Sequence, residues 1–209
     1  MPRPPILKIT EIFSSIQGEG LRQGEPTHFI RLAGCNLRCA FCDTKYGWER
    51  GKDFTLLDIL ETTKKNHTRF PADWVCLTGG EPLLQDVAEL VLMLKQEGFC
   101  VQVETNATNY RRLDVDWYSI SPKPEKYFYQ PEYRTKAREV KILLTKGLDM
   151  RIIQRLRKEF PKEIPLILQP VSNRKWSVNL GVKLLMEASR AGLKNIRLSA
   201  QLHKMFNFR

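Results

Sequence analysis

The chain lacks the two sequence features that would direct a protein into or across a membrane. None of its apolar runs approaches the length of a membrane-spanning helix. Its first residues, MPRPPILKIT, contain no apolar segment of the kind found in signal peptides. We therefore expect a cytoplasmic protein with no membrane partner.

Cysteine and histidine are scarce, with five and three residues among 209. Five cysteines in a chain of this size do not indicate the disulfide framework of a small secreted protein. Three of the five nevertheless lie within eight residues of one another. Clustered cysteines in a cytosolic protein more often bind metal or carry out chemistry, so these three are the first candidates for function.

Acidic residues are outnumbered, since 34 Lys and Arg face 23 Asp and Glu and the net charge is +11. The basic residues are spread along the chain and do not form one block. This distribution favours a solvated basic surface over a nucleic-acid site, and we expect no nucleic-acid partner. The length suits a single domain that spans residues 1–209.

Short apolar runs alternate with amphipathic segments along most of the chain. Strands are predicted at Thr27–Leu32, Trp74–Leu77, Cys100–Glu104, Asp116–Ile120, Glu139–Leu144, Pro165–Gln169 and Asn195–Ser199. Helices are predicted at Thr55–Asn66, after Asp86, at Met150–Glu159 and at Val178–Ala191, with an irregular loop over Lys123–Lys136. This order predicts an α/β fold, a partial and open β/α barrel with about six parallel strands.

The loops after the predicted strands contain the residues that could bind ligands or carry out chemistry. In parallel β/α folds such residues lie at the carboxyl ends of the strands. The first such loop reads GCNLRCAFCDT and contains Cys35, Cys39 and Cys42. Thiolates suit zinc or iron–sulfur clusters, and this spacing can place three sulfurs at three corners of a [4Fe–4S] cluster. A zinc site that recruits Cys76, Cys100 or a histidine is the alternative.

The three cysteines carry a family resemblance. With Phe41 before the third cysteine, they match the C-x3-C-x-aromatic-C signature of radical S-adenosylmethionine enzymes, and TGGEP follows the next predicted strand. More widely, EIFSSIQGEG, HFIRLAGCNLRCAFCDT, VETNAT, SISPKP and ILQPVS resemble the 7-carboxy-7-deazaguanine synthases of queuosine and 7-deazapurine biosynthesis. This resemblance extends from Ile9 to about His203.

The resemblance implies a carbon–nitrogen lyase that contracts the ring of 6-carboxy-5,6,7,8-tetrahydropterin, with loss of ammonia, to give 7-carboxy-7-deazaguanine. It further implies a [4Fe–4S] cluster, S-adenosylmethionine and Mg²⁺ as cofactors. A flavodoxin or ferredoxin is the expected electron donor, and a homodimer is the expected assembly.

The resemblance also assigns roles to individual residues. It implies cluster binding by Cys35, Cys39 and Cys42, and magnesium binding by Thr44. It implies cofactor binding by Phe41, Cys42, Asp43, Gly80, Ser121, Pro122, Lys123 and Gln169. It implies substrate binding by Ile16, Gln17, Gly18, Arg31 and Thr78. The expected task of Arg31 is to bind the substrate carboxylate, although an arginine in a strand more commonly pairs with an acidic neighbour.

Two other functions fit parts of the sequence. An activating enzyme for a glycyl-radical protein would share the cysteine loop and GGEP but would act on a protein. A basic zinc or iron–sulfur protein that binds RNA would not be an enzyme at all. The IQGEG and CDT segments favour the pterin reaction over both.

Overall fold

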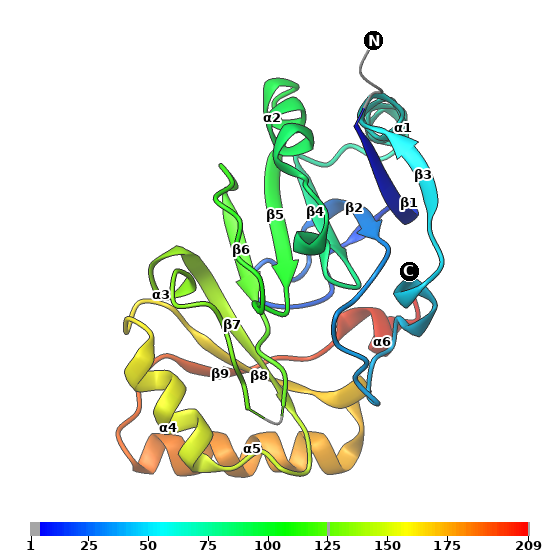
Figure 1. Cartoon of the computed structure of the whole chain (residues 1–209). Coiled ribbons are helices and arrows are strands. Elements are labelled where there is room, and N and C mark those ends of the chain that lie inside the picture. The colour runs from blue at the N-terminus through cyan, green and yellow to red at the C-terminus, as the bar shows by residue number, and fades with distance from the viewer. Residues whose placement is uncertain (1–4, 125, 209) are drawn as a thin grey trace. The chain divides into compact units, whose positions relative to one another are not determined.

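The computed structural model describes residues 5–124 and 126–208. Its internal contacts divide the chain into two compact units. Unit 1 contains the chain up to Ile16, together with Glu25–Thr105 and Arg111–Trp117. Unit 2 contains Gln17–Gly24, Asn106–Tyr110 and the chain from Tyr118 onward. Each unit contains strands and the helices that cover them (Figure 1).

Unit 1 is built on strands whose spatial order differs from their order in the chain. The order is β3 (Lys52–Thr55), β1 (Ile6–Ile16), β2 (Pro26–Leu32), β4 (Trp74–Gly79) and β5 (Cys100–Thr105). The pairs β1–β2 and β1–β3 are antiparallel, whereas β2–β4 and β4–β5 are parallel. The parallel strands are largely buried, as strands covered on both faces must be.

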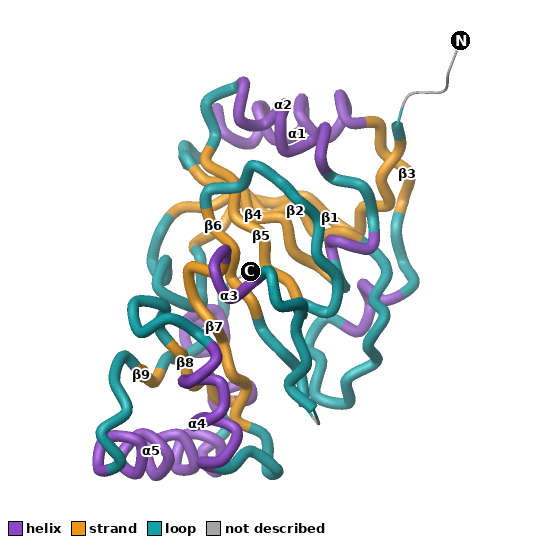
Figure 2. The backbone as a smooth tube through the Cα atoms, turned by 60° about the vertical axis from the view of Figure 1, so that its left-hand side comes forward, coloured by secondary structure: helices purple, strands orange, loops and turns teal. Residues whose placement is uncertain are grey.

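Helices α1 (Leu56–Arg69) and α2 (Ala88–Gln96) lie side by side against the strands of unit 1 (Figure 2). The predicted start of α1 is confirmed, because Thr55 and Asp58 form a reciprocal capping box. The predicted cap of α2 is wrong by one residue. Val87 is the N-cap, while the Asp86 carboxylate accepts a bond from the Ala88 amide at 3.2 Å.

Unit 2 has an all-parallel strand order of β6 (Trp117–Ile120), β7 (Ala137–Leu144), β8 (Leu166–Pro170) and β9 (Ile196–Leu198). Helices α4 (Met150–Glu159) and α5 (Lys175–Arg190) run side by side below these strands in Figure 1. Short elements complete the described chain: η1 (Lys45–Trp48), η2 (Pro82–Leu84), η3 (Val171–Asn173), α3 (Tyr133–Lys136) and α6 (Leu202–Phe206).

Several elements depart from the sequence prediction, among them strand β3 and helix α6, which were not predicted. The predicted loop over Lys123–Lys136 ends in helix α3, because the Tyr133 ring is fully buried and packs edge-on against Tyr110 and Tyr118. Strand β1 was not predicted. Its burial pattern is too mixed for clear alternation, and its partners β2 and β3 lie elsewhere in the sequence.

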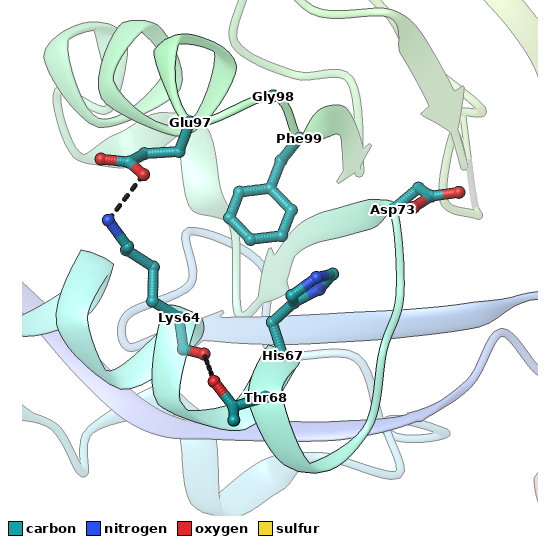
Figure 3. Close-up of a pocket in the computed structure, with 7 residues that line it drawn as sticks. All are labelled: Lys64, His67, Thr68, Asp73, Glu97, Gly98 and Phe99. Carbon is teal, nitrogen blue, oxygen red and sulfur yellow. Dashed lines mark hydrogen bonds and ion pairs between the residues drawn. The ribbon is translucent and has the colours of Figure 1, made fainter.

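A pocket of about 380 Å³ lies in unit 1 between the end of α1 and the start of β5 (Figure 3). The rings of His67 and Phe99 meet edge to face there, with centroids 5.4 Å apart. The fully buried ring of His28 lies 5.7 Å from His67, and its Nδ1 atom is 2.7 Å from the Ser14 hydroxyl. The pocket adjoins the amino ends of β4 and β5, so it lies away from the loops that follow these strands.

Burial, together with the neighbouring His67, lowers the pKa of His28 from 6.5 to about 4. Between pH 4 and pH 6.5, His28 is protonated in the unfolded chain but not in the folded chain. The contribution of His28 to stability is therefore full above pH 6.5 and is lost as the pH drops toward 4. We expect a loss of about 2 kcal/mol between pH 7 and pH 5.

Urea unfolding at the two pH values measures this loss, and His28→Gln is the control because glutamine does not titrate there. The variant should lose most of the pH dependence in this window. An unchanged dependence in His28→Gln would show that another group is responsible.

Candidate functional site

The three clustered cysteines lie in the loop that follows β2 in unit 1. All three thiols are half-buried, and none of them forms a disulfide. The Leu37 amide donates to the Cys35 sulfur at 3.4 Å, and the Cys42 amide donates to the Cys39 carbonyl at 3.1 Å. A short loop with its own internal bonds thus presents three sulfurs, the donor type that iron–sulfur clusters require.

Burial raises the pKa of the Cys35 thiol, and the Leu37 amide opposes that effect. Nearby negative charge from Glu81, Cys39 and Cys42 raises the pKa further. The loop therefore brings the three sulfurs close enough to affect one another electrostatically. A bound cation would relieve this repulsion, because metal coordination favours the thiolate.

No group of three or more His, Cys, Asp or Glu side chains within residues 5–124 and 126–208 is arranged around a single ion. A cubane cluster does not need such a group, since each cysteine binds a different iron at a separate corner. The chemistry of the donor set fits a cluster.

Gly79 and Gly80 bring the end of β4 directly against the cysteine loop. The Gly80 amide donates to the Leu32 carbonyl at 3.1 Å, and the Glu81 amide donates to the Gly34 carbonyl at 2.8 Å. A Cβ atom on Gly80 would overlap the Gly34 carbonyl and lie 3.0 Å from the Cys35 Cβ. Only glycine permits this approach. The fully buried Glu81 then caps η2 by accepting from the Leu83 amide at 3.1 Å.

Two residues predicted to bind substrate are neighbours in unit 1. Arg31 in β2 and Thr78 in β4 occupy paired positions, so both side chains lie on one face of the sheet. The Thr78 hydroxyl donates to the Glu104 carboxylate in β5 at 3.3 Å. Arg31 donates through Nε to the Glu11 carboxylate in β1 at 2.7 Å. This face therefore carries four polar side chains in a line across β1, β2, β4 and β5. We call Glu11, Arg31, Thr78 and Glu104 the polar row.

Asp43 and Thr44, which follow the third cysteine, bring oxygen atoms next to the cysteine loop. The Thr44 hydroxyl donates to the Asp43 carboxylate at 3.0 Å, and the Thr44 carbonyl accepts from Gly47 at 2.9 Å. Phe41 is half-buried and Asp43 is exposed. These oxygens are the hard donors that Mg²⁺ prefers, although one hydroxyl cannot complete its shell.

The IQGEG segment lies partly in each unit. Ile16 ends β1 and is 38% exposed. In unit 2, Gln17 is buried, its carbonyl accepts from Gly24 at 2.8 Å, and its side-chain oxygen accepts from the Glu19 amide at 3.1 Å. The Gly18 carbonyl accepts from the Leu202 amide at 3.0 Å. The segment is thus fixed within unit 2 by the chain's last helix.

The other predicted cofactor residues lie at the ends of unit 2 strands. Ser121, Pro122 and Lys123 follow β6, and the Lys123 ammonium donates to the Ser121 hydroxyl at 2.7 Å. Gln169 is buried within β8. Within the part of the chain that the structure describes, its Oε1 atom has no hydrogen-bond partner.

Sequence reasoning missed a buried ion pair in unit 2. The Glu19 carboxylate accepts from Lys141 at 2.9 Å and from Gln201 at 2.7 Å. Burial raises the pKa of Glu19, but Lys141 and the amides of Gln201 and Gln169 outweigh it and hold this pKa far below its usual range. The one available signal was a lysine inside the apolar strand EVKILL.

Three comparisons with known proteins agree with this geometry. The family model "Radical SAM superfamily" matches residues 29–124. The 7-carboxy-7-deazaguanine synthase of Aquifex aeolicus is 33% identical over 98% of this chain and 95% of that protein. The enzyme of the same name from Bacteroides thetaiotaomicron is 37% identical over 97% and 98%.

The chain belongs to the 7-carboxy-7-deazaguanine synthase family. The crystal structure of QueE from Escherichia coli matches it with a TM-score of 0.78 and 28% identity, over 95% of each chain. A structure of TYW1, at 15% identity and a TM-score of 0.57, shares the fold. The predicted α/β class, with a largely parallel and open strand arrangement, is confirmed. In this synthase the radical SAM match covers the cysteine loop, the polar-row residues of β2, β4 and β5, and the Gly79–Gly80 turn.

Gly80→Ala tests whether the close approach of β4 supports the cysteine loop. The added methyl group must displace the Gly34 carbonyl, so we expect a loss of about 1–3 kcal/mol in unfolding free energy. The variant should also lose most of its iron after anaerobic reconstitution.

Gly147→Ala is the matched control, because a Cβ atom there meets nothing within 4 Å. It should keep wild-type iron content and stability. Normal iron content in Gly80→Ala would mean that the loop does not depend on this contact.

Proposed function

We propose that this protein is a 7-carboxy-7-deazaguanine synthase, a radical S-adenosylmethionine lyase that converts 6-carboxy-5,6,7,8-tetrahydropterin to 7-carboxy-7-deazaguanine with loss of ammonia. The observation that carries the proposal lies within unit 1. There a three-cysteine loop packs against a Gly-Gly turn, beside an arginine and a threonine in strand register. Family membership supports the same reaction.

The cysteine loop is the proposed seat of a [4Fe–4S] cluster held by Cys35, Cys39 and Cys42. Three protein ligands would leave one iron open to S-adenosylmethionine. When bound, the cluster and this cofactor would supply the radical chemistry that begins the reaction of the pterin. Phe41 is half-buried in this loop, and we assign it to the cofactor site.

We also assign a cofactor contact to Gly80, because its turn packs directly against the cysteine loop. We assign further cofactor contacts to Asp43, Ser121, Pro122, Lys123 and Gln169. The unpartnered Oε1 atom of Gln169 and the Ser121–Lys123 bond support polar recognition in unit 2.

Substrate contacts are assigned to Ile16, Gln17, Gly18, Arg31 and Thr78. The Arg31 guanidinium can bind the C6 carboxylate through parallel hydrogen bonds, and Thr78 can add a hydroxyl from the neighbouring strand. Thr44 is assigned to Mg²⁺, whose shell substrate oxygens and water would complete.

The proposal includes a flavodoxin or ferredoxin as reductant, a homodimer, and one radical SAM domain over residues 1–209. It also includes a cytoplasmic location. No helix among the described residues is long and apolar enough to cross a membrane. The glycyl-radical activase alternative is not favoured by the relatives found.

Anaerobic turnover with the pterin, S-adenosylmethionine, Mg²⁺ and a reductant tests the function directly. We expect a product with the mass of 7-carboxy-7-deazaguanine and about four irons per reconstituted chain. One zinc per chain without iron, or cofactor cleavage without pterin conversion, would disprove the assignment.

Cys39→Ala and Thr44→Ala separate the cluster from the magnesium site. Cys39→Ala should abolish cofactor cleavage and lower the iron content, because one corner of the cluster loses its ligand. Thr44→Ala should retain iron and cleavage but respond less to added Mg²⁺. Unchanged cleavage of S-adenosylmethionine by Cys39→Ala is incompatible with the cluster assignment.

A further inference from the structure

Glu11 lies opposite Arg31 because strand β1 contains a bulge. Ile9 pairs with Leu32, but the next pair joins Glu11 to Arg31, so β1 advances by two residues where β2 advances by one. The extra residue is Thr10, whose hydroxyl donates to the Arg50 carbonyl at 2.9 Å. Such bulges change which side chain faces a given position, and here the bulge brings a carboxylate to the polar row.

One oxygen of Glu11 holds two groups. Its Oε1 atom accepts from Arg31 Nε at 2.7 Å and from the Tyr46 hydroxyl at 2.9 Å. Tyr46 belongs to η1, which begins immediately after Thr44. Glu11 therefore connects the arginine of β2 with the segment that follows the cysteine loop.

This contact holds the guanidinium of Arg31 through Nε and not through the terminal Nη groups. The contact with Glu11 uses the Nε atom of Arg31, whereas bidentate recognition of a carboxylate can use the two Nη groups. The Phe13 ring lies 5.7 Å from the guanidinium carbon and restricts it further. Arg31 and Glu11 keep 18% and 16% of their side-chain surfaces exposed, so a ligand can reach the pair.

Strand pairing alone does not account for this contact. The stacked rings of Phe13 and Phe29, 5.1 Å apart, already join β1 to β2 on the same face and pack with the buried Cys76. A largely buried ion pair is weak evidence for stability, because removing its two charges from water offsets much of their attraction. What the pair adds is orientation, because an arginine held before binding loses less side-chain freedom when its ligand arrives.

We propose that Glu11 is a positioning residue for recognition of the substrate carboxylate. It holds Arg31 so that the Nη groups face the carboxylate at C6 of the pterin, and Tyr46 keeps Glu11 in place. This inference rests on the proposed function. It predicts that Glu11 controls discrimination between pterins with and without that carboxylate, while it leaves the cluster and the cofactor unaffected.

The experiment compares binding of 6-carboxytetrahydropterin and of tetrahydropterin without the carboxylate. Reconstituted protein with S-adenosylmethionine and Mg²⁺ is used in anaerobic equilibrium dialysis. Glu11→Ala should weaken binding of the carboxylated pterin about tenfold or more and leave the other pterin unaffected. Glu11→Gln keeps an oxygen for Arg31 Nε and should stay within about threefold of wild type.

Asp53→Ala is the matched control. It removes an exposed ion pair with Lys8 between β1 and β3, and it should not alter either affinity. Iron content and S-adenosylmethionine binding should match wild type in every variant. If Glu11→Ala does not fold, Tyr46→Phe tests the same point, since it removes one bond to Glu11 and should selectively weaken binding of the carboxylated pterin.

Three results would overturn the proposal. Glu11→Ala could weaken binding of both pterins equally, it could leave both affinities unchanged, or it could lower the iron content. Failure of the proposed function is distinguishable from these. In that case the wild-type protein itself would show no preference for the carboxylated pterin, and this inference would fall with it.

Discussion

The contact between the end of β4 and the cysteine loop is the constraint on which the site in unit 1 depends. Two backbone hydrogen bonds, from Gly80 to Leu32 and from Glu81 to Gly34, join the two segments at 3.1 and 2.8 Å. Both segments need a glycine next to these bonds, since Gly34 in the cysteine loop and Gly79 at the end of β4 have φ angles of +91° and +127°. With these bonds in place, the loop sulfurs and the Gly80 turn occupy fixed positions at the ends of β2 and β4.

Polar groups concentrate at the ends of the strands, and each acidic group there is held by donors. Glu81 accepts from the Leu83 amide and from the Thr105 hydroxyl at 2.7 Å. In unit 2, Glu19 is held in the same manner by Lys141 and Gln201. A buried charge is tolerated only when such partners satisfy it. The apolar strands thus form the core, while their ends present oriented polar side chains suited to a small polar ligand.

Local sequence signals gave the elements that depend on near neighbours. The capping of α1 by Thr55 and Asp58, the buried parallel strands and the cysteine spacing all involve residues within a few positions of one another. The bulge in β1 could not be predicted in this way. It is defined by pairing with a strand some twenty residues away, and a shift of one residue exchanges the faces of a strand.

The sequence by itself determined the donor chemistry, because three thiols at C-x3-C-x2-C spacing and a Gly-Gly turn are local facts. It also determined the alternation of strands and helices, which arises from local periodicity. Only the tertiary structure decided which charges meet. Glu11 faces Arg31, and Glu19 meets Lys141 across 122 positions of the chain. Such pairs are set by strand register and packing, which bring distant residues together and leave no local pattern in the sequence.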